Sequence, residues 1–146
     1  NRKREIALIF YDRLNQFDEF VKPQKILSKG YHSYYSFPLY AKNKDFRDRL
    51  VLLLDKKYNI YCAKGYANPV PLYQCVMPLI NPKKYGKKLI YSNRSYPEGT
   101  CPVAEDLLKR SFLIPFNETY SDDDVKEILS RLSTAIEECI ELEKNK

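Results

Sequence analysis

Residues 101–140, CPVAEDLLKRSFLIPFNETYSDDDVKEILSRLSTAIEECI, decide the fold. They predict a helix that begins at Pro102, a short buried strand over 112–116, a polar turn, and a long closing helix. Proline fits a first helical turn, because the N–H that it lacks has no intrahelical acceptor there. The apolar run FLIPF is too short for a helix and is followed by polar turn residues, so it predicts a strand.

The closing helix carries its own start signal. Ser121 is a good N-cap and Asp124 stands in capping-box position, while three successive aspartates suit the positive end of the helix dipole. Helical spacing then places the apolar residues on one face: Val125, Ile128, Leu129, Leu132, Ala135, Ile136, Cys139 and Ile140. We interpret this whole segment as scaffold.

Upstream, two helices and two strands are predicted. Residues 1–20 form an amphipathic helix that Pro23 ends, with an apolar stripe that Ala7 and Ile9 widen: Ile6, Phe10, Leu14 and Phe17. Residues 33–41 are rich in Tyr and Phe and predict a strand, in which Pro38 indicates an edge or irregular position. Asn43 caps a helix over 44–57, and 59–63 predicts a further strand.

Composition limits the function classes. The chain has 146 residues, the length of one domain with a real core. Its four cysteines form no C-x-x-C pair, so we expect reduced thiols in a cytoplasm and no structural metal. No apolar run approaches the ~18 residues of a membrane span, and no signal-peptide pattern is present. The chain opens at Asn1 on a basic helix, as an excised part of a longer protein would.

Charge is distributed unevenly. From Asn117 onward there are 9 acids and 4 bases, a net of −5, which leaves 21 bases and 10 acids, a net of +11, in the rest. Residues 83–96 mix this positive charge with tyrosines, a composition that suits single-stranded nucleic acid: Lys83, Lys84, Tyr85, Lys87, Lys88, Tyr91, Arg94 and Tyr96. A basic nucleic-acid-binding module is therefore an alternative function, although no RNA-binding motif accompanies this loop. A stand-alone interaction domain is a second alternative.

The sequence lacks the common motifs of catalytic, phosphate-binding and metal-binding sites. His32 is the only histidine and has no nucleophile or second histidine in a matching pattern, so we interpret it as structural or surface. The sequence has no Gly-rich phosphate loop, no H-E-x-x-H and no G-x-S-x-G. We predict no catalytic residue and no metal site in this chain.

Several pieces together resemble a known family. The chain begins with NRKREIALIFYDRL, which is followed by HSYYSF and by the DFRDRL…NIY…PVPLY run. After these come PVAE, an apolar strand ending in Pro115, and SDDDVKEI. This order resembles the C-terminal part of the DegT/DnrJ/StrS family of pyridoxal-phosphate-dependent sugar aminotransferases. The resemblance implies that 1–146 is a C-terminal small domain whose large cofactor-binding domain is absent from this chain.

The resemblance also implies an activity for the parent protein. The parent would be a homodimer that transfers an amino group from glutamate or glutamine to a keto-sugar or keto-cyclitol, in nucleotide-sugar and polysaccharide biosynthesis. Pyridoxal phosphate would be held by the large domain of the same polypeptide, and the fragment alone would bind no cofactor and be inactive. No nucleic acid and no membrane is then expected as a partner.

The segment 64–100 carries the substrate-site prediction. The resemblance implies that its first half folds toward the substrate cleft, and we predict Tyr66, Asn68 and Tyr73 as lining residues. The chain departs from the family pattern at Gly65 and Tyr73, where histidines are common, which leaves the substrate open. The fold predicted overall is a single α+β domain with a small, mainly antiparallel sheet of about three strands and helices packed on one face.

Overall fold

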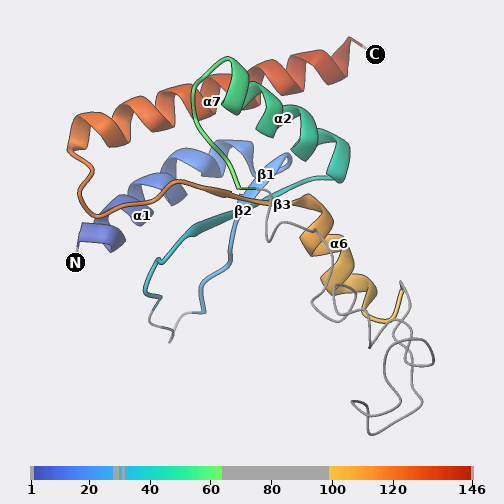
Figure 1. The fold of residues 1–146 in the computed structure, drawn as a ribbon, viewed down its shortest axis with the longest axis horizontal. Helices are drawn as coiled ribbons and strands as arrows, with labels where there is room; N and C mark the ends of the chain where they lie inside the picture. The colour runs from blue at the N-terminus through green and yellow to red at the C-terminus, as the bar shows by residue number, and fades with distance from the viewer. Residues whose placement is uncertain (1, 28–29, 31, 64–98, 146) are drawn as a thin grey trace, which may run out of the picture.

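The computed structural model describes residues 2–27, 30, 32–63 and 99–145, and in these ranges the chain forms helices around one antiparallel sheet (Figure 1). The elements in order are α1 (Arg2–Leu14), the 3₁₀ turn η1 (Asn15–Phe17), β1 (Val21–Pro23), β2 (Phe37–Ala41), α2 (Lys44–Lys56), α6 (Pro102–Arg110), β3 (Ser111–Ile114) and α7 (Asp122–Lys144). The predicted α+β class with a three-stranded antiparallel sheet is therefore confirmed.

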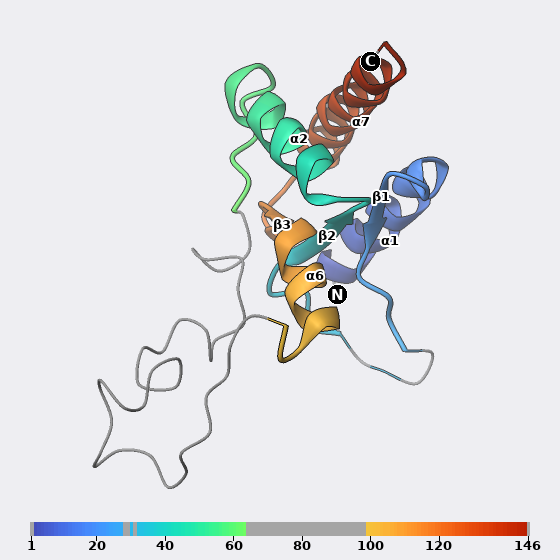
Figure 2. The ribbon, with the colours of Figure 1, turned by 90° about the vertical axis from the view of Figure 1, so that its right-hand side faces the viewer.

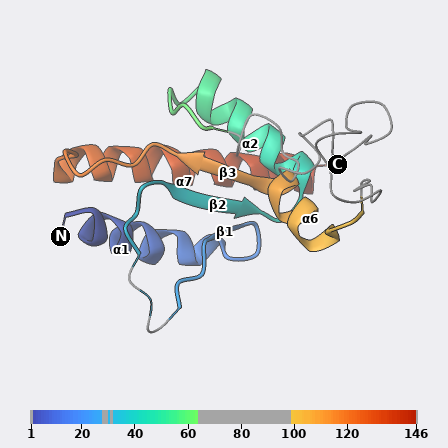
Figure 3. The ribbon, with the colours of Figure 1, turned by 60° about the horizontal axis from the view of Figure 1, so that its bottom comes forward.

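The sheet has the order β1-β2-β3, so β2 is its central strand (Figure 3). In the register Phe37 lies opposite Ile114 and Leu39 opposite Phe112. These side chains, with Ala41, are buried on the face that α1, α2 and α7 cover. The alternate residues point to the other face, which α6 borders (Figure 2).

The core is aromatic where α1 meets the sheet. The rings of Phe10 and Phe37 have centroids 5.2 Å apart, and Phe116 stacks on Phe37 at 5.4 Å. From α7, Leu132 and Ile136 are fully buried in the same cluster. Each such side chain contributes about 1.5–3 kcal/mol by leaving water, so the two terminal helices and the sheet stabilise one another.

Both predicted caps are confirmed. The Ser121 hydroxyl accepts the N–H of Asp124 at 3.1 Å, and the Asp124 carboxylate accepts the N–H of Ser121 at 2.9 Å, which makes a complete capping box. The Asn43 side chain accepts the N–H of Phe46 at 2.8 Å at the start of α2. Both helices therefore begin where the sequence indicates.

The first helix is shorter than predicted. It ends at Leu14, a 3₁₀ turn follows within the range predicted as helix, and residues 21–23 form the edge strand β1, which was not predicted. Pro23 ends no helix but sits in this edge strand, where a residue without an N–H is tolerated. Ile9, expected to widen the buried stripe, is 45% exposed.

The strand predicted over 59–63 is wrong, because only Ala63 pairs with the sheet, through an isolated bridge to Leu113. The residues before it complete the end of α2. Asn59 adopts a left-handed φ of 53°, and the N–H of Ile60 bonds the carbonyl of Leu54 at 2.7 Å. The left-handed residue after the last turn ends the helix and turns the chain away from strand geometry.

The strand predicted over 33–41 begins only at Phe37, because the residues before it do not keep the alternation of a strand. Tyr34 has a φ of 52° and is buried, whereas Tyr35 is 89% exposed. His32 fixes this turn, because its Nδ1 accepts the N–H of Tyr34 at 2.9 Å and the two rings lie 4.5 Å apart. A left-handed residue interrupts the alternation of faces that a strand imposes, and His32 is structural, as we predicted.

Pro38 lies in the central strand, so the edge position is excluded and the irregular position, the other expectation for Pro38, applies. The N–H of Gln24 donates to the carbonyl of Pro38 at 3.2 Å. A regular antiparallel pair would return a bond to the carbonyl of Gln24, but proline has no N–H to give. The Tyr11 hydroxyl donates to that carbonyl instead, at 2.6 Å.

Helices α2 and α7 are joined by a charged contact. The Glu143 carboxylate accepts hydrogen bonds from Lys42 and, at 2.5 Å, from Arg49. The Lys42 ammonium, with a further contribution from the Arg49 guanidinium, holds the pKa of Glu143 below its ordinary value. Lys42 also lies 4.8 Å from the ring centre of Phe20, so its position is fixed by two contacts.

We predict that the Tyr11 hydroxyl and Pro38 are energetically coupled. Tyr11→Phe leaves the Gln24 carbonyl without a donor and lowers the free energy of unfolding by about 1 kcal/mol. In a Pro38→Ala background the strand regains an N–H for that carbonyl, so the same Tyr11 change costs less. Urea unfolding of the four proteins in a double-mutant cycle measures this, and equal costs in both backgrounds would contradict the assignment.

We also predict an acid-dependent contribution from Glu143. A lowered folded-state pKa stabilises the fold above the unfolded value of about 4.3, and this stabilisation disappears as the pH falls through the folded pKa. Glu143→Gln therefore lowers the thermal midpoint at pH 7, and the difference from wild type shrinks by about pH 2–3. Glu141→Gln on the exposed side of the same helix is the control, and a pH-independent difference for Glu143→Gln would refute the prediction.

Candidate functional site

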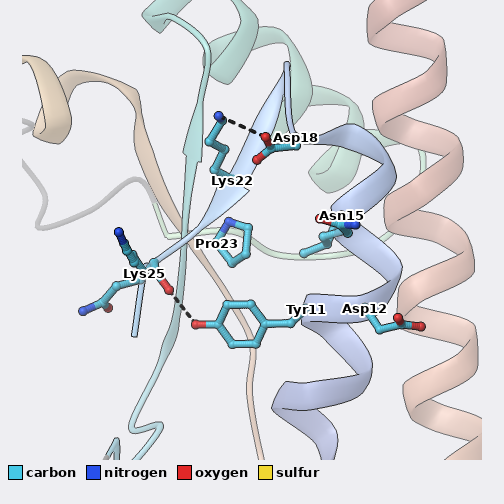
Figure 4. A pocket seen from close by; sticks show the side chains of 9 residues that line it. Tyr11, Asp12, Asn15, Asp18, Lys22, Pro23 and Lys25 are labelled. Atoms are coloured by element: carbon cyan, nitrogen blue, oxygen red, sulfur yellow. Dashed lines mark hydrogen bonds and ion pairs between the residues drawn. The ribbon is translucent and has the colours of Figure 1, made fainter. Parts of the chain in front are cut away.

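A polar hollow of about 610 Å³ lies between the end of α1 and β1 (Figure 4). Polar groups at this hollow already form a hydrogen bond and an ion pair within the domain. The Tyr11 hydroxyl bonds the Gln24 carbonyl, and burial raises the pKa of Tyr11 to about 12, which keeps it a neutral donor. Lys22 pairs with Asp18 at 3.2 Å across the rim. These contacts leave no convergent set of groups that indicates a ligand.

A second hollow, of about 550 Å³, is apolar and lies on the face of the sheet opposite the core. Its floor is formed by Pro38 and Tyr40 of β2 and Leu113 of β3, the residues that alternate with the buried ones. Its wall is α6, through Ala104, Leu107 and Leu108. Ligand and partner sites are typically concave and apolar in this way, so this hollow is the candidate site.

The apolar side of α6 contributes little to the domain core. Val103, Leu107 and Leu108 recur at helical spacing, but Val103 is 72% exposed and the two leucines are only half-buried. Glu105 is the one buried residue of this helix. An amphipathic helix that keeps its apolar side in solvent indicates a surface that another surface covers.

Both ends of the segment 64–98 are attached beside this hollow. At one end Ala63 exchanges two backbone hydrogen bonds with Leu113, at 3.0 and 2.7 Å. At the other end the Glu105 carboxylate accepts the N–H of Gly99 at 2.8 Å and the N–H of Cys101 at 3.1 Å. Leu113 lines the hollow and Glu105 belongs to its wall helix, so the two described residues that flank the segment are both bonded to elements that form the candidate site.

The residues predicted to line the substrate cleft, Tyr66, Asn68 and Tyr73, lie outside the described residues, and so does the Lys- and Tyr-rich loop 83–96. Their roles stay predictions. Sequence reasoning did not find the apolar hollow or the role of Glu105. The signal for the hollow was the presence of apolar residues at both the odd and the even positions of 37–41. The signal for Glu105 was an acidic residue four positions after Cys101.

The described residues do not fit the pyridoxal phosphate that the family resemblance implies. A lysine that binds the cofactor covalently needs an enclosed setting with an acidic partner for the ring nitrogen. No lysine in the described ranges is buried, and those with ion pairs, such as Lys57 with Glu138, lie at the surface. We therefore derive no cofactor contact from this chain.

Two buried thiols are also unsuited to nucleophilic catalysis. Burial raises the pKa of the Cys62 thiol to about 12 and that of Cys139 to about 11, so neither is a nucleophile near neutral pH. Among the residues that the structure describes, no cluster of three or more His, Cys, Asp or Glu could hold a metal ion. In the same ranges, none of the helices combines the length and apolar character of a membrane span.

Comparison with known proteins gives matches in structure. No protein-family model and no curated protein matches the sequence. Among solved structures, the chain is similar to the aminotransferase TlmJ from Streptoalloteichus hindustanus, with a TM-score of 0.65 and 22% identity over 92% of this chain. It is also similar to a DegT DnrJ EryC1 StrS aminotransferase from Brucella abortus, with a TM-score of 0.63 and 20% identity over 91% of this chain.

A third similar structure is NtdA from Bacillus subtilis, solved with bound cofactor PMP, with a TM-score of 0.67 and 14% identity over 93% of this chain. At such identities the likeness establishes the fold. It confirms the fold expected from the family resemblance. The chain spans only 31%, 30% and 28% of the lengths of the three proteins.

We predict that Glu105 holds the start of α6. Glu105→Gln replaces one carboxylate oxygen by an amide nitrogen that cannot accept a hydrogen bond, so the change costs about 1–3 kcal/mol of unfolding free energy. Asp106→Asn is the matched control, because that carboxylate forms only a surface pair with Arg110 and its loss costs about 0–1 kcal/mol. Urea unfolding and amide exchange at Gly99 and Cys101 measure the difference. Equal effects of the two changes would disprove the role.

Proposed function

We propose that this chain is the C-terminal small domain of a pyridoxal-phosphate-dependent aminotransferase of the DegT/DnrJ/StrS family. The parent enzyme transfers an amino group from glutamate or glutamine to a keto-sugar or keto-cyclitol, in the biosynthesis of nucleotide sugars and polysaccharides. It works in the cytoplasm as a homodimer, and its large domain binds the cofactor. The small domain is catalytically inactive by itself.

The observation that carries this proposal is the pattern of structural coverage. More than nine-tenths of this chain aligns with each of three aminotransferases, while less than a third of each aminotransferase is used. A shared fold alone does not assign an activity. Here it coincides with the ordered sequence pieces PVAE, SDDDVKEI and HSYYSF, which independently resemble the same family.

The contribution of this domain to the reaction is substrate enclosure. The segment that contains Tyr66, Asn68 and Tyr73 follows Ala63, which pairs with Leu113 of the apolar hollow, and precedes Gly99, which Glu105 of the wall helix binds. Tyrosine hydroxyls and an asparagine amide are suited to hydrogen bonds with the hydroxyls of a sugar or cyclitol. We propose that these three residues line the substrate cleft of the parent enzyme.

The test uses the full polypeptide that the gene encodes and, separately, this chain alone. We expect the full polypeptide to bind pyridoxal phosphate, seen as visible absorbance, and to form 2-oxoglutarate from glutamate in the presence of a nucleotide-linked keto-sugar. Tyr73→Phe raises the KM for the keto substrate without loss of cofactor absorbance, because the proposed role of the hydroxyl is to bind the substrate. Stoichiometric cofactor binding by the chain 1–146 alone, or a full polypeptide that binds none, would overturn the proposal.

A further inference from the structure

Two neighbouring tyrosines before β2 lie on opposite sides of the chain. Tyr34 is buried with its ring centroid 6.0 Å from that of Phe116, whereas Tyr35 is 89% exposed and borders the apolar hollow. The core side of β2 is formed by Phe37 and Leu39, which are odd-numbered. Because the side chains of a strand alternate, β2 continued backwards would bury Tyr35 and expose Tyr34. The structure therefore holds the two tyrosines in the reverse of their strand positions.

The reversed arrangement depends on a hydrogen bond to His32. The N–H of Tyr34 donates to Nδ1 of His32 at 2.9 Å, and the centroids of the two rings lie 4.5 Å apart. Within this turn Tyr34 has a φ of 52°, a left-handed angle that a bulky side chain adopts only when its surroundings impose it. An imidazole nitrogen accepts a hydrogen bond only when it carries no proton. The arrangement therefore requires neutral His32 with its proton on Nε2.

Exchange of the two tyrosines preserves the packing of the core, because their side chains are identical. Phe37 stacks on Phe116 with centroids 5.4 Å apart, and a ring at position 35 would lie beside this pair on the same face of β2. The buried volume then stays constant, a condition under which cores tolerate rearrangement. The exchange also returns Tyr34 to an extended backbone. In the present arrangement the hydrogen bond to His32 offsets the left-handed angle.

We propose that His32 is a pH-responsive switch that selects which of the two tyrosines is buried. Protonation makes Nδ1 a donor, which then faces the N–H of Tyr34 and breaks the bond. The left-handed turn opens, β2 extends backwards through Tyr35, and Tyr34 moves to the side of the hollow. Histidine is the side chain that ordinarily changes charge between about pH 5 and 8, so the exchange occurs in mild acid. The switch needs only this chain and is independent of the proposed function.

The other ionisable groups around this turn keep their charge in that range. Within the described residues, Arg4 and Tyr11 of α1 are the groups that interact electrostatically with Tyr34. Arginine stays protonated throughout. Burial raises the pKa of Tyr11 to about 12 and also raises the pKa of Tyr34, so both phenols stay neutral. From the segment after β3, the turn meets the uncharged ring of Phe116. Of these described groups, His32 is therefore the one that mild acid changes.

The experiment follows the imidazole of His32 by nitrogen NMR in the chain 1–146, where it is the only histidine. At about pH 7.5 we expect the tautomer protonated on Nε2, with nuclear Overhauser contacts between the rings of Tyr34 and Phe116. As the imidazole becomes protonated toward about pH 5.5, the contacts of Phe116 pass from Tyr34 to Tyr35. Over the same titration the hydrogen-exchange protection of the Tyr34 amide falls about tenfold, because the amide loses its acceptor.

Two substitutions at position 32 separate the switch from general effects of acid. His32→Asn supplies an acceptor that does not titrate, so we expect Tyr34 to stay buried at both pH values. His32→Lys supplies a charge and no acceptor, so we expect Tyr35 to be buried already at neutral pH. The amide of Gly30 is the internal control for exchange, because its acceptor, the carbonyl of Leu27 at 2.8 Å, does not titrate.

The proposal is overturned by a proton on Nδ1 at neutral pH, or by protonated His32 with Tyr34 still beside Phe116. An exchange that also occurs in His32→Asn would assign the effect to another group and overturn the proposal as well. If His32→Lys does not fold, the wild-type titration and His32→Asn decide the question on their own.

Discussion

A sheet of three short strands has two faces, and α1, α2 and α7, among the helices of the described residues, bury only one of them. Phe37, Leu39 and Phe112 point into the core under α1, α2 and α7. The residues between them must point the other way, because the side chains of a strand alternate. Here they are apolar or aromatic, as at Pro38, Tyr40 and Leu113. One-sided burial therefore explains both the stability of the domain and its apolar hollow.

In the central strand β2, a side-chain hydroxyl takes the place of a missing backbone N–H as hydrogen-bond donor. Pro38 removes an N–H from the middle of the sheet, and the hydroxyl of Tyr11 reaches across from α1 to the carbonyl that this N–H would serve. The same tyrosine packs its ring on Phe37, with centroids 5.3 Å apart. The contact of α1 with the sheet is thus polar and apolar at once, and it fixes the helix against the strand that organises the core.

Local signals predicted the helices well, because caps and apolar spacing act within a few residues of one another. Ser121 and Asn43 mark starts that the structure reproduces. The strands were harder. β1 has only three residues and forms because β2 is beside it, which no local pattern states. Asn59 and Tyr34 adopt left-handed backbone angles that shift the strand limits. The apolar hollow was missed because it joins residues about 70 positions apart, such as Tyr40 and Leu108.

The attachment of residues 64–98 at two fixed points has an evolutionary consequence. Ala63 is held by the backbone of Leu113, and Gly99 by the carboxylate of Glu105, so the scaffold positions both ends independently of what connects them. The entropy of closing a loop changes by only about 0.6 kcal/mol for each doubling of its length. Insertions, deletions and exchanges between the two points therefore leave the framework intact, and relatives of this domain can diverge in recognition there at almost no thermodynamic cost.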